Sequence, residues 1–256
     1  MRIRASDYCC QGGECVFETD GISTDRLVLK TEGNRELVFC PLGNQPSEPV
    51  VALVGITPGG QSERFAKYLR MGWSVERAAS AAAFSGGQPT IRRLLRAHGF
   101  AERMGIQLPE GDLNNNPQVL TTSLVKCCIR TQGSYRFQAP DIAASAMASF
   151  CVRRRFIADI EKYPSLRCAV FFGNEGAEVV DTFAIANSTL RSILEERGVS
   201  SIKLPHFSQS FQTRALYLLE DDEDERRYLA AHPNHSGYAP RARMMRIQMQ
   251  RFVESL

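Results

Sequence analysis

Four short apolar segments recur along the chain, and stretches with helical spacing separate them. The apolar segments are residues 50–55 (VVALVG), 119–126 (VLTTSLVK), 168–173 (CAVFFG) and 201–205 (SIKLP). The helical stretches are residues 62–69, 91–98, 142–162 and 175–198. Strands that alternate with helices form parallel sheets with helices on both faces. The pattern therefore predicts an α/β fold, a three-layer α/β/α sandwich around a central, mainly parallel four-stranded sheet.

The chain has 256 residues, which is enough for one large domain. We expect a single domain with an irregular N-terminal segment (1–48), a core (49–210) and a C-terminal part (211–256). The N-terminal segment contains two short strand-like pieces, DRLVLK at residues 25–30 and RELVFC at residues 35–40. The C-terminal part carries an acidic insert, EDDEDE at residues 220–225, and a final helix. No apolar run reaches the ~18 residues of a membrane helix, and the N-terminus has no apolar signal-peptide core. These features predict a cytoplasmic protein with no membrane partner. We also expect a monomer.

The charge pattern is more informative than the formal net charge of +3. Arginines gather at residues 92–96, 153–155 and 241–246. Separate basic clusters suit a partner with spread negative charge, such as a nucleic-acid backbone. The alternative is that these clusters are solvated faces of helices.

In parallel sheets, ligands bind beyond the carboxyl ends of the strands. Small or polar residues follow all four predicted strands, and the first strand ends in GITPGGQSE. There Gly55, Gly59 and Gly60 permit backbone conformations closed to other residues, and Pro58 restricts a turn. We expect a rigid loop against which a flat ligand can lie, with Ser62 capping the next helix. The alternative is a simple strand-to-helix turn, and the loop matches neither the P-loop nor the dinucleotide-binding motif.

Four motifs in this order resemble the uracil-DNA glycosylase superfamily. Residues 55–59 (GITPG) are similar to its G-x-x-P-G first motif, and residues 122–127 (TSLVKC) to the second strand of its iron–sulfur branch. Residues 172–173 (FG) match the end of its third strand, and residues 204–208 (LPHFS) stand where it has His-Pro-Ser. The resemblance covers residues 50–210. It implies a monofunctional DNA repair enzyme that hydrolyses the N-glycosidic bond of uracil, or of a related deaminated base. The partner would be uracil-containing DNA, and the products free uracil and an abasic site.

The resemblance also implies a pocket at the strand ends for a base extruded from the duplex. The implied catalytic residues are Thr57, His206, Glu63 and Gln61. His206 would stabilise the departing base and Thr57 would hold the attacking water. The implied base-binding residues are Gly55, Ile56, Pro58, Gly59, Phe65, Ser123 and Ser208, with Phe65 stacking on the base.

The chain departs from the superfamily at several of these positions. Thr57 stands where the mismatch-specific branch has Asn, and Ile56 where the iron–sulfur branch has Glu; neither is a general base. Ser123 replaces the Asn that reads the uracil edge. These departures leave open a second function, non-catalytic binding of nucleic acid or a nucleotide on the same fold. An unrelated α/β hydrolase is disfavoured because the chain has no G-x-S-x-G motif.

A second candidate for the last motif lies downstream, in AHPNHSGY at residues 231–238. Its histidines, His232 and His235, compete with His206, which directly follows a predicted strand. The same stretch opens the final helix and is expected to bind DNA phosphates. The predicted phosphate-binding residues are Asn234, His235, Ser236 and Arg241.

The chain has eight cysteines. In the iron–sulfur branch, cysteines hold a cluster, and four cysteines here fall in roughly the corresponding regions: Cys10, Cys15, Cys127 and Cys151. The N-terminal pair is separated by four residues rather than two. We therefore expect no metal or other cofactor, with an iron–sulfur cluster as the alternative.

Overall fold

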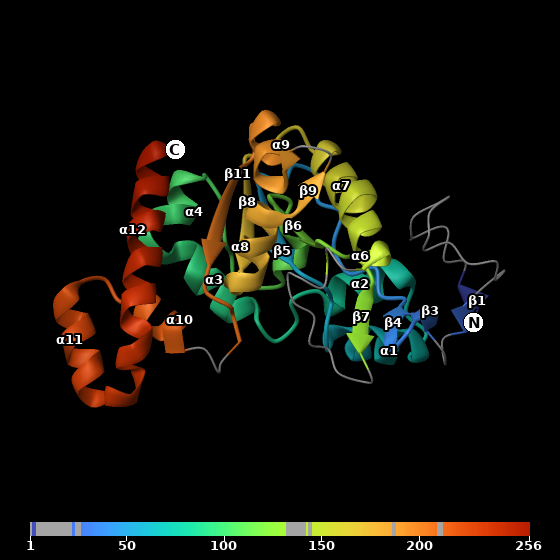
Figure 1. The fold of residues 1–256 in the computed structure, drawn as a ribbon, viewed down its shortest axis with the longest axis horizontal. Helices are drawn as coiled ribbons and strands as arrows, with labels where there is room; N and C mark the ends of the chain where they lie inside the picture. Colours follow the sequence, from blue (N-terminus) through green and yellow to red (C-terminus); the bar gives the residue numbers. More distant parts are fainter. Residues whose placement is uncertain are drawn as a thin grey trace.

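A computed structural model describes residues 2–3, 22–23, 27–131, 142, 145–185, 188–208 and 212–256. Its central sheet has four parallel strands in the order β6-β5-β8-β11 (Figure 1). The strands are β5 (Val51–Gly55), β6 (Val119–Ser123), β8 (Cys168–Phe172) and β11 (Ser200–Leu204). The predicted α/β fold with a parallel four-stranded sheet is confirmed.

The strand order and register bring the predicted site segments to one edge of the sheet. Gly55 pairs with Ser123, and Leu204 pairs with Phe172, so the carboxyl ends of the strands are level. The chain passes from β5 to β6 on one side and later adds β8 on the other side of β5. Such an order leaves a crevice between the two central strands at their carboxyl ends, where doubly wound folds bind ligands.

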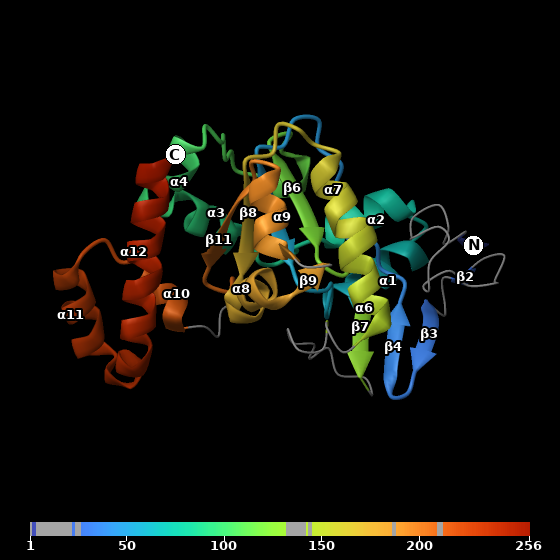
Figure 2. The same ribbon diagram turned by 45° about the horizontal axis from the view of Figure 1, so that its top comes forward.

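Helices cover both faces of the sheet (Figures 1 and 2). Right-handed crossovers place the β5–β6 connection on one face and the later connections on the other. The first face carries α1 (Gln61–Arg70), α2 (Val75–Ala82), α3 (Gln88–Arg96), a 3-10 turn (Ala97–Gly99) and α4 (Phe100–Arg103). A further 3-10 turn (Leu113–Asn115) precedes β6. The second face carries α6 (Ala146–Cys151), a π-helical segment (Val152–Phe156), α7 (Ile157–Glu161), α8 (Gly173–Thr182) and α9 (Leu190–Glu196).

A second, antiparallel sheet lies beyond β6 and was not predicted. Its strands are β3 (Val28–Glu32), β4 (Arg35–Val38) and β7 (Cys128–Thr131), in the order β3-β4-β7. A two-stranded pair, β1 (Arg2–Ile3) and β2 (Ile22–Ser23), is also present. The strand-like pieces expected at residues 25–30 and 35–40 correspond to β3 and β4, which form a β-hairpin. The sheet that this hairpin builds with β7 was not expected. The predicted strand at 119–126 ends earlier, at Ser123, because the chain turns there into β7.

Two expected helical features differ in the structure. The stretch 175–198 is not one helix: α8 ends at Thr182, and a short hairpin of β9 (Ala184–Ile185) and β10 (Ser188–Thr189) precedes α9. Thr189 starts α9 by accepting a hydrogen bond from Ser192 N. Ser62 does not cap α1, because it already lies inside the helix and its hydroxyl donates to the Gly59 carbonyl at 2.8 Å.

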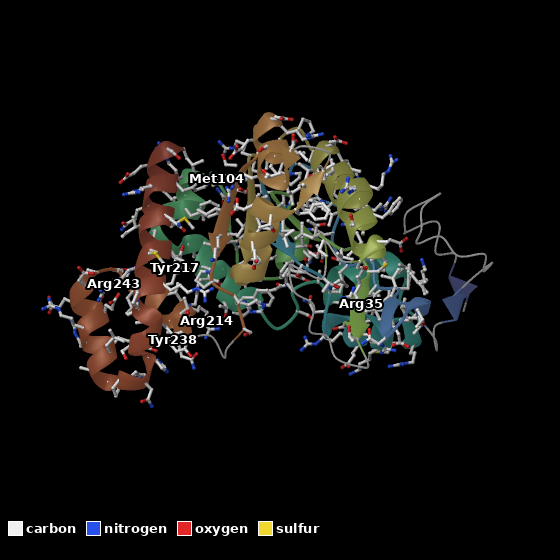
Figure 3. All side chains as sticks on the ribbon, in the orientation of Figure 1. Arg35, Met104, Arg214, Tyr217, Tyr238 and Arg243 are labelled. Carbon is white, nitrogen blue, oxygen red and sulfur yellow. The ribbon has the colours of Figure 1, made fainter. Side chains whose placement is uncertain are left out.

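The acidic block at residues 220–225 contains the start of a helix, α11 (Asp222–Ala231). The C-terminal part contains α10 (Gln212–Tyr217), α11 (Asp222–Ala231), a 3-10 helix (Pro233–Tyr238) and α12 (Ala239–Ser255). Asp221 caps α11 by accepting hydrogen bonds from the N–H groups of Glu223 and Asp224. Glu225 is buried between the two helices and accepts hydrogen bonds from Arg243 and Arg246 of α12. Figure 3 shows Arg243 between α11 and α12. The block therefore holds this helical pair together.

Among the residues that the structure describes, no helix combines the length and apolar character needed to cross a membrane.

Candidate active site

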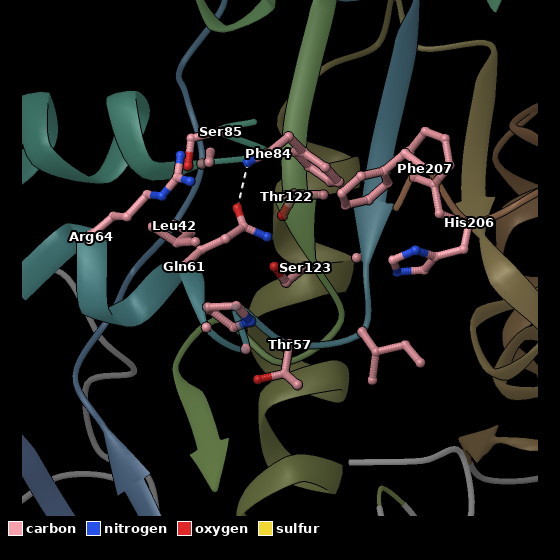
Figure 4. A pocket seen from close by; sticks show the side chains of 18 residues that line it. Leu42, Thr57, Gln61, Arg64, Phe84, Ser85, Thr122, Ser123, His206 and Phe207 are labelled. Carbon is pink, nitrogen blue, oxygen red and sulfur yellow. Dashed lines mark hydrogen bonds between the residues drawn. The ribbon is translucent and has the colours of Figure 1, made fainter. Parts of the chain in front are cut away.

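A cavity of about 650 Å³ lies at the carboxyl ends of the central strands (Figure 4). The loop after β5 forms one wall, and the end of β6, the end of β8 and the loop after β11 form the others. The predicted site residues that line the cavity are Gly55, Ile56, Thr57, Pro58, Gly59, Gln61, Ser123 and His206. The lining residues that were not predicted are Leu42, Gly43, Gly60, Arg64, Ala83, Phe84, Ser85, Thr122, Phe172 and Phe207. The structure thus brings together most of the predicted residues from three separate segments.

Backbone hydrogen bonds hold the loop at residues 55–60 in place. The carbonyl of Gly55 accepts a hydrogen bond of 2.9 Å from Leu124 N, and the carbonyl of Ile56 accepts one of 2.9 Å from Val125 N. Gly59 adopts a φ of +57°, a left-handed conformation that favours glycine. These contacts fix the start of the loop against β6, and the left-handed Gly59 explains one of the glycines that follow β5. That a flat ligand lies against this loop stays a prediction.

The side chain of Thr57 is part of the same anchoring. Its hydroxyl donates a hydrogen bond of 3.2 Å to the carbonyl of Cys127 and accepts one of 3.2 Å from Ile129 N. The hydroxyl proton is committed to the backbone, and one lone pair remains for a water. Thr57 cannot donate to a water unless it breaks its bond to Cys127.

His206 enters the cavity from the end of β11. Its Nδ1 accepts a hydrogen bond of 3.1 Å from the backbone N–H of Ser208. Because Nδ1 is an acceptor, the neutral ring carries its proton on Nε2 and can donate from that atom. The imidazole stacks on Phe207 with a centroid distance of 4.6 Å. Figure 4 shows the ring pointing toward Ser123 and Gln61. Ser208 is not part of the lining, but its backbone orients the histidine.

Three phenylalanines form the apolar wall of the cavity. The rings of Phe84, Phe172 and Phe207 meet edge to face at centroid distances of 5.4–5.8 Å. Phe207 packs directly on Gly87, where an added Cβ would lie 2.3 Å from the ring. The predicted stacking residue, Phe65, is fully buried in the core and does not line the cavity. An aromatic surface for a flat ring is therefore present, but other residues supply it.

The polar side chains of the cavity are hydroxyls, the amide of Gln61, His206 and one arginine. Arg64 is exposed at the rim and has no ion-pair partner in the part of the chain that the structure describes. The hydroxyl of Thr122 is occupied, since it donates to Asp159 at 3.0 Å and accepts from Lys126 at 2.7 Å. Among the described lining residues there is no Asp or Glu. The predicted Glu63 is exposed on α1, outside the lining.

No protein-family model matches this chain. A search of the curated proteins finds no match either. The function of the cavity must therefore be argued from its own geometry and chemistry.

The downstream histidine cluster lies away from the cavity. His235 bonds to the hydroxyl of Tyr228 at 2.9 Å, and His232 stacks on the same tyrosine at 4.5 Å. Neither histidine lines the cavity, and the predicted phosphate-binding Asn234, Ser236 and Arg241 do not either. They belong to the helices at the C-terminal end of the molecule (Figure 1). As a pocket residue, His206 is therefore favoured by geometry over both downstream histidines.

Most arginines of the three basic clusters bind other parts of the chain. Arg92 and Arg96 donate to the carbonyls of Gly111 and Leu108, and Arg153 donates to the carbonyl of Ala184. In the third cluster the α12 arginines at 243 and 246 bind the buried carboxylate of α11. These clusters hold loops and helices in place, so their presence is weak support for a nucleic-acid surface.

Two of the possible cluster ligands, Cys10 and Cys15, lie outside the described residues. The side chains of Cys127 and Cys151 are buried, and Lys126 N donates to the sulfur of Cys151 at 3.2 Å. Within the described ranges, no group of three or more His, Cys, Asp or Glu side chains is arranged to hold a metal. The expectation that the protein works without a cofactor stays a prediction, which the visible absorbance of the purified protein tests.

Proposed function

We propose that this protein is a DNA glycosylase that releases uracil, or a related base with a carbonyl edge, from DNA. The observation that carries the proposal is the position of His206. Its Nδ1 is held by Ser208 N at 3.1 Å, so the protonated Nε2 is presented to a cavity with an aromatic wall at the carboxyl ends of the sheet. A donor fixed in such a place stabilises negative charge that develops on a ligand.

In the proposed reaction the N-glycosidic bond breaks and its electron pair leaves with the base. The sugar becomes an oxocarbenium-like cation, and the base becomes an anion whose carbonyl oxygen accepts the Nε2–H of His206. Water then adds to the anomeric carbon. Its oxygen forms the new bond, and the released proton passes to the base or to solvent. The edge-to-face trio of Phe84, Phe172 and Phe207 gives the extruded base an apolar surface.

The order of these steps follows from the groups that line the cavity. No carboxylate is present among the described lining residues, and the proton of Thr57 is engaged by the Cys127 carbonyl. Departure of the base therefore precedes attack, because a cationic sugar is a strong electrophile and needs little help from a general base. In this scheme the rate depends more on His206 than on any group that orients water.

The test is single-turnover excision from an oligonucleotide that carries one uracil, read out by alkaline cleavage at the abasic site. His206→Ala should slow release about a hundredfold, the usual effect of removing one such donor, while DNA affinity stays nearly unchanged. His232→Ala and His235→Ala are the controls and should keep the wild-type rate. Full activity in His206→Ala together with loss in either control would transfer the role to the downstream cluster.

A second candidate function is binding without chemistry. The observation that favours it is the same absence of a carboxylate from the described lining, combined with the engaged hydroxyl of Thr57. Wild-type protein that binds uracil-containing DNA but releases no base in the assay would establish this function in place of hydrolysis.

A further inference from the structure

The side chain of Gln61 has a defined amide orientation. Gln61 is the first residue of α1, and its Oε1 accepts a hydrogen bond of 2.5 Å from the backbone N–H of Phe84. Only the oxygen of an amide can accept from an N–H, so this contact assigns the positions of the oxygen and the nitrogen in the Gln61 amide. The Nε2 amino group must be the end that remains for other partners. Figure 4 shows this bond and the amide inside the cavity.

The amino group of Gln61 is available to a ligand. It has no hydrogen-bond partner in the part of the chain that the structure describes, and Gln61 is a lining residue. It carries two protons and no acceptor, so it can bind only an oxygen or an unprotonated nitrogen. The anchoring residue is itself held, because the ring of Phe84 packs against Phe172 and Phe207. This packing keeps Phe84 in a left-handed conformation, with a φ of +52°, that a residue other than glycine rarely adopts.

The neighbouring polar groups are compatible with the same kind of ligand. Ser123 lines the cavity, and its Oγ has no hydrogen-bond partner within the described residues. It lies 3.7 Å from the position that a Cβ on Gly55 would occupy, at the floor of the cavity. A hydroxyl can donate or accept, whereas the amino group of Gln61 can only donate. Of these two unpartnered groups, therefore, only the amino group of Gln61 can discriminate a ligand with a hydrogen-bond acceptor from a ligand with a donor at that position.

We propose that Gln61 determines which bases enter the site, by donating from Nε2 to an exocyclic carbonyl oxygen. Uracil and hypoxanthine present a carbonyl at the position where cytosine and adenine present an amino group. An amino group there would face the amino group of Gln61, and both would be buried without partners. The proposal rests on the proposed function for its substrate, but the selection itself is a property of binding.

The deciding variant is Gln61→Glu. One carboxylate oxygen keeps the bond from Phe84 N, so the loop stays anchored, and the other oxygen now offers an acceptor where the amide offered donors. We expect the wild type to bind free uracil at least about a hundredfold more tightly than free cytosine. In Gln61→Glu the preference should disappear or reverse. Gln61→Met, which has similar length and no polar group, should bind both bases weakly.

Binding is measured by calorimetric titration with the two free bases, and excision is measured separately with uracil oligonucleotides. Gln248→Glu on α12 is the matched control, because it adds the same charge at an exposed position outside the cavity. It should leave the uracil preference intact. Equal unfolding temperatures for all variants show that the fold is preserved.

The outcomes separate the two proposals. If the wild type excises uracil and Gln61→Glu still prefers uracil, the inference about Gln61 is overturned and the glycosylase proposal stands. If the wild type excises nothing but prefers uracil, and Gln61→Glu abolishes that preference, the inference stands and hydrolysis is wrong. Equal binding of both bases by the wild type, or binding of neither, overturns the inference.

Discussion

Replacing Thr57 with valine tests whether this residue holds the loop or holds the water. Valine keeps the shape of the side chain and removes the hydroxyl, so the bonds to Cys127 O and Ile129 N, each of 3.2 Å, are lost. Each neutral hydrogen bond contributes about 1 kcal/mol, so the two together contribute about 2 kcal/mol to the free energy of unfolding. The loss lies at the junction of the β5 loop with β7, so it should loosen the cavity wall as well.

The assay is urea unfolding followed by circular dichroism. With a urea dependence of about 3 kcal/mol per molar, a loss of about 2 kcal/mol lowers the midpoint by about 0.7 M. Thr57→Ser is the control, because it retains the hydroxyl, and its midpoint should stay close to the wild-type value. The reasoning is refuted if Thr57→Val unfolds at the wild-type midpoint but loses base excision, since the hydroxyl would then act on the reaction and not on the loop.

Two further predictions concern packing and charge. Gly87→Ala should lower the free energy of unfolding by about 1–3 kcal/mol and displace Phe207, because the added Cβ would lie 2.3 Å from that ring. Gly60→Ala is the control in thermal unfolding and should be tolerated, because a Cβ added there meets no atom within 4 Å. Burial alone would raise the pKa of Glu225, but hydrogen bonds from the α12 arginines outweigh burial and hold that pKa below its ordinary value of 4.5. The folded state thus favours the ionised form, so this stabilisation is present above about pH 4.5 and is lost as the pH falls below it. Unfolding temperatures measured against pH should show the loss in the wild type and a smaller pH dependence in Glu225→Gln; identical profiles would contradict the assignment.

Local pattern was sufficient for the central sheet. Each of its strands is a short apolar run, and those at 51–55, 119–123 and 168–172 are buried almost throughout. Such runs bounded by turn residues are visible without any knowledge of distant contacts. The second sheet was not expected, although two of its strands, β3 and β4, were visible as short strand-like pieces; its third strand, β7, was missed. β3 and β4 form a local hairpin, but β4 pairs with β7 from a distant part of the chain, and local pattern does not reveal this pairing.

The position of the site also followed from the sequence, because parallel strands of equal length end at one edge. The segments after β5, β6 and β11 were therefore expected to meet, and they do in the cavity. Phe172 and Phe207 lay within the motifs that were recognised, yet the aromatic wall was assigned to Phe65. That residue points into the core because it lies on the buried side of α1. The left-handed backbone of Phe84 had no local signal at all.

Local sequence pattern was enough to place the four central strands and most of the helices, and to locate the edge of the sheet at which polar loops gather. These features depend on periodicity and on turn residues a few positions apart. The role of each side chain, in contrast, depends on contacts between segments that are far apart in the chain. The hydroxyl of Thr57 meets a carbonyl 70 residues away, and the amide of Gln61 is oriented by an N–H 23 residues away. The residues around either partner do not indicate such a hydrogen bond. The anchoring role of Thr57 and the donor orientation of Gln61 can therefore be assigned only from the folded structure.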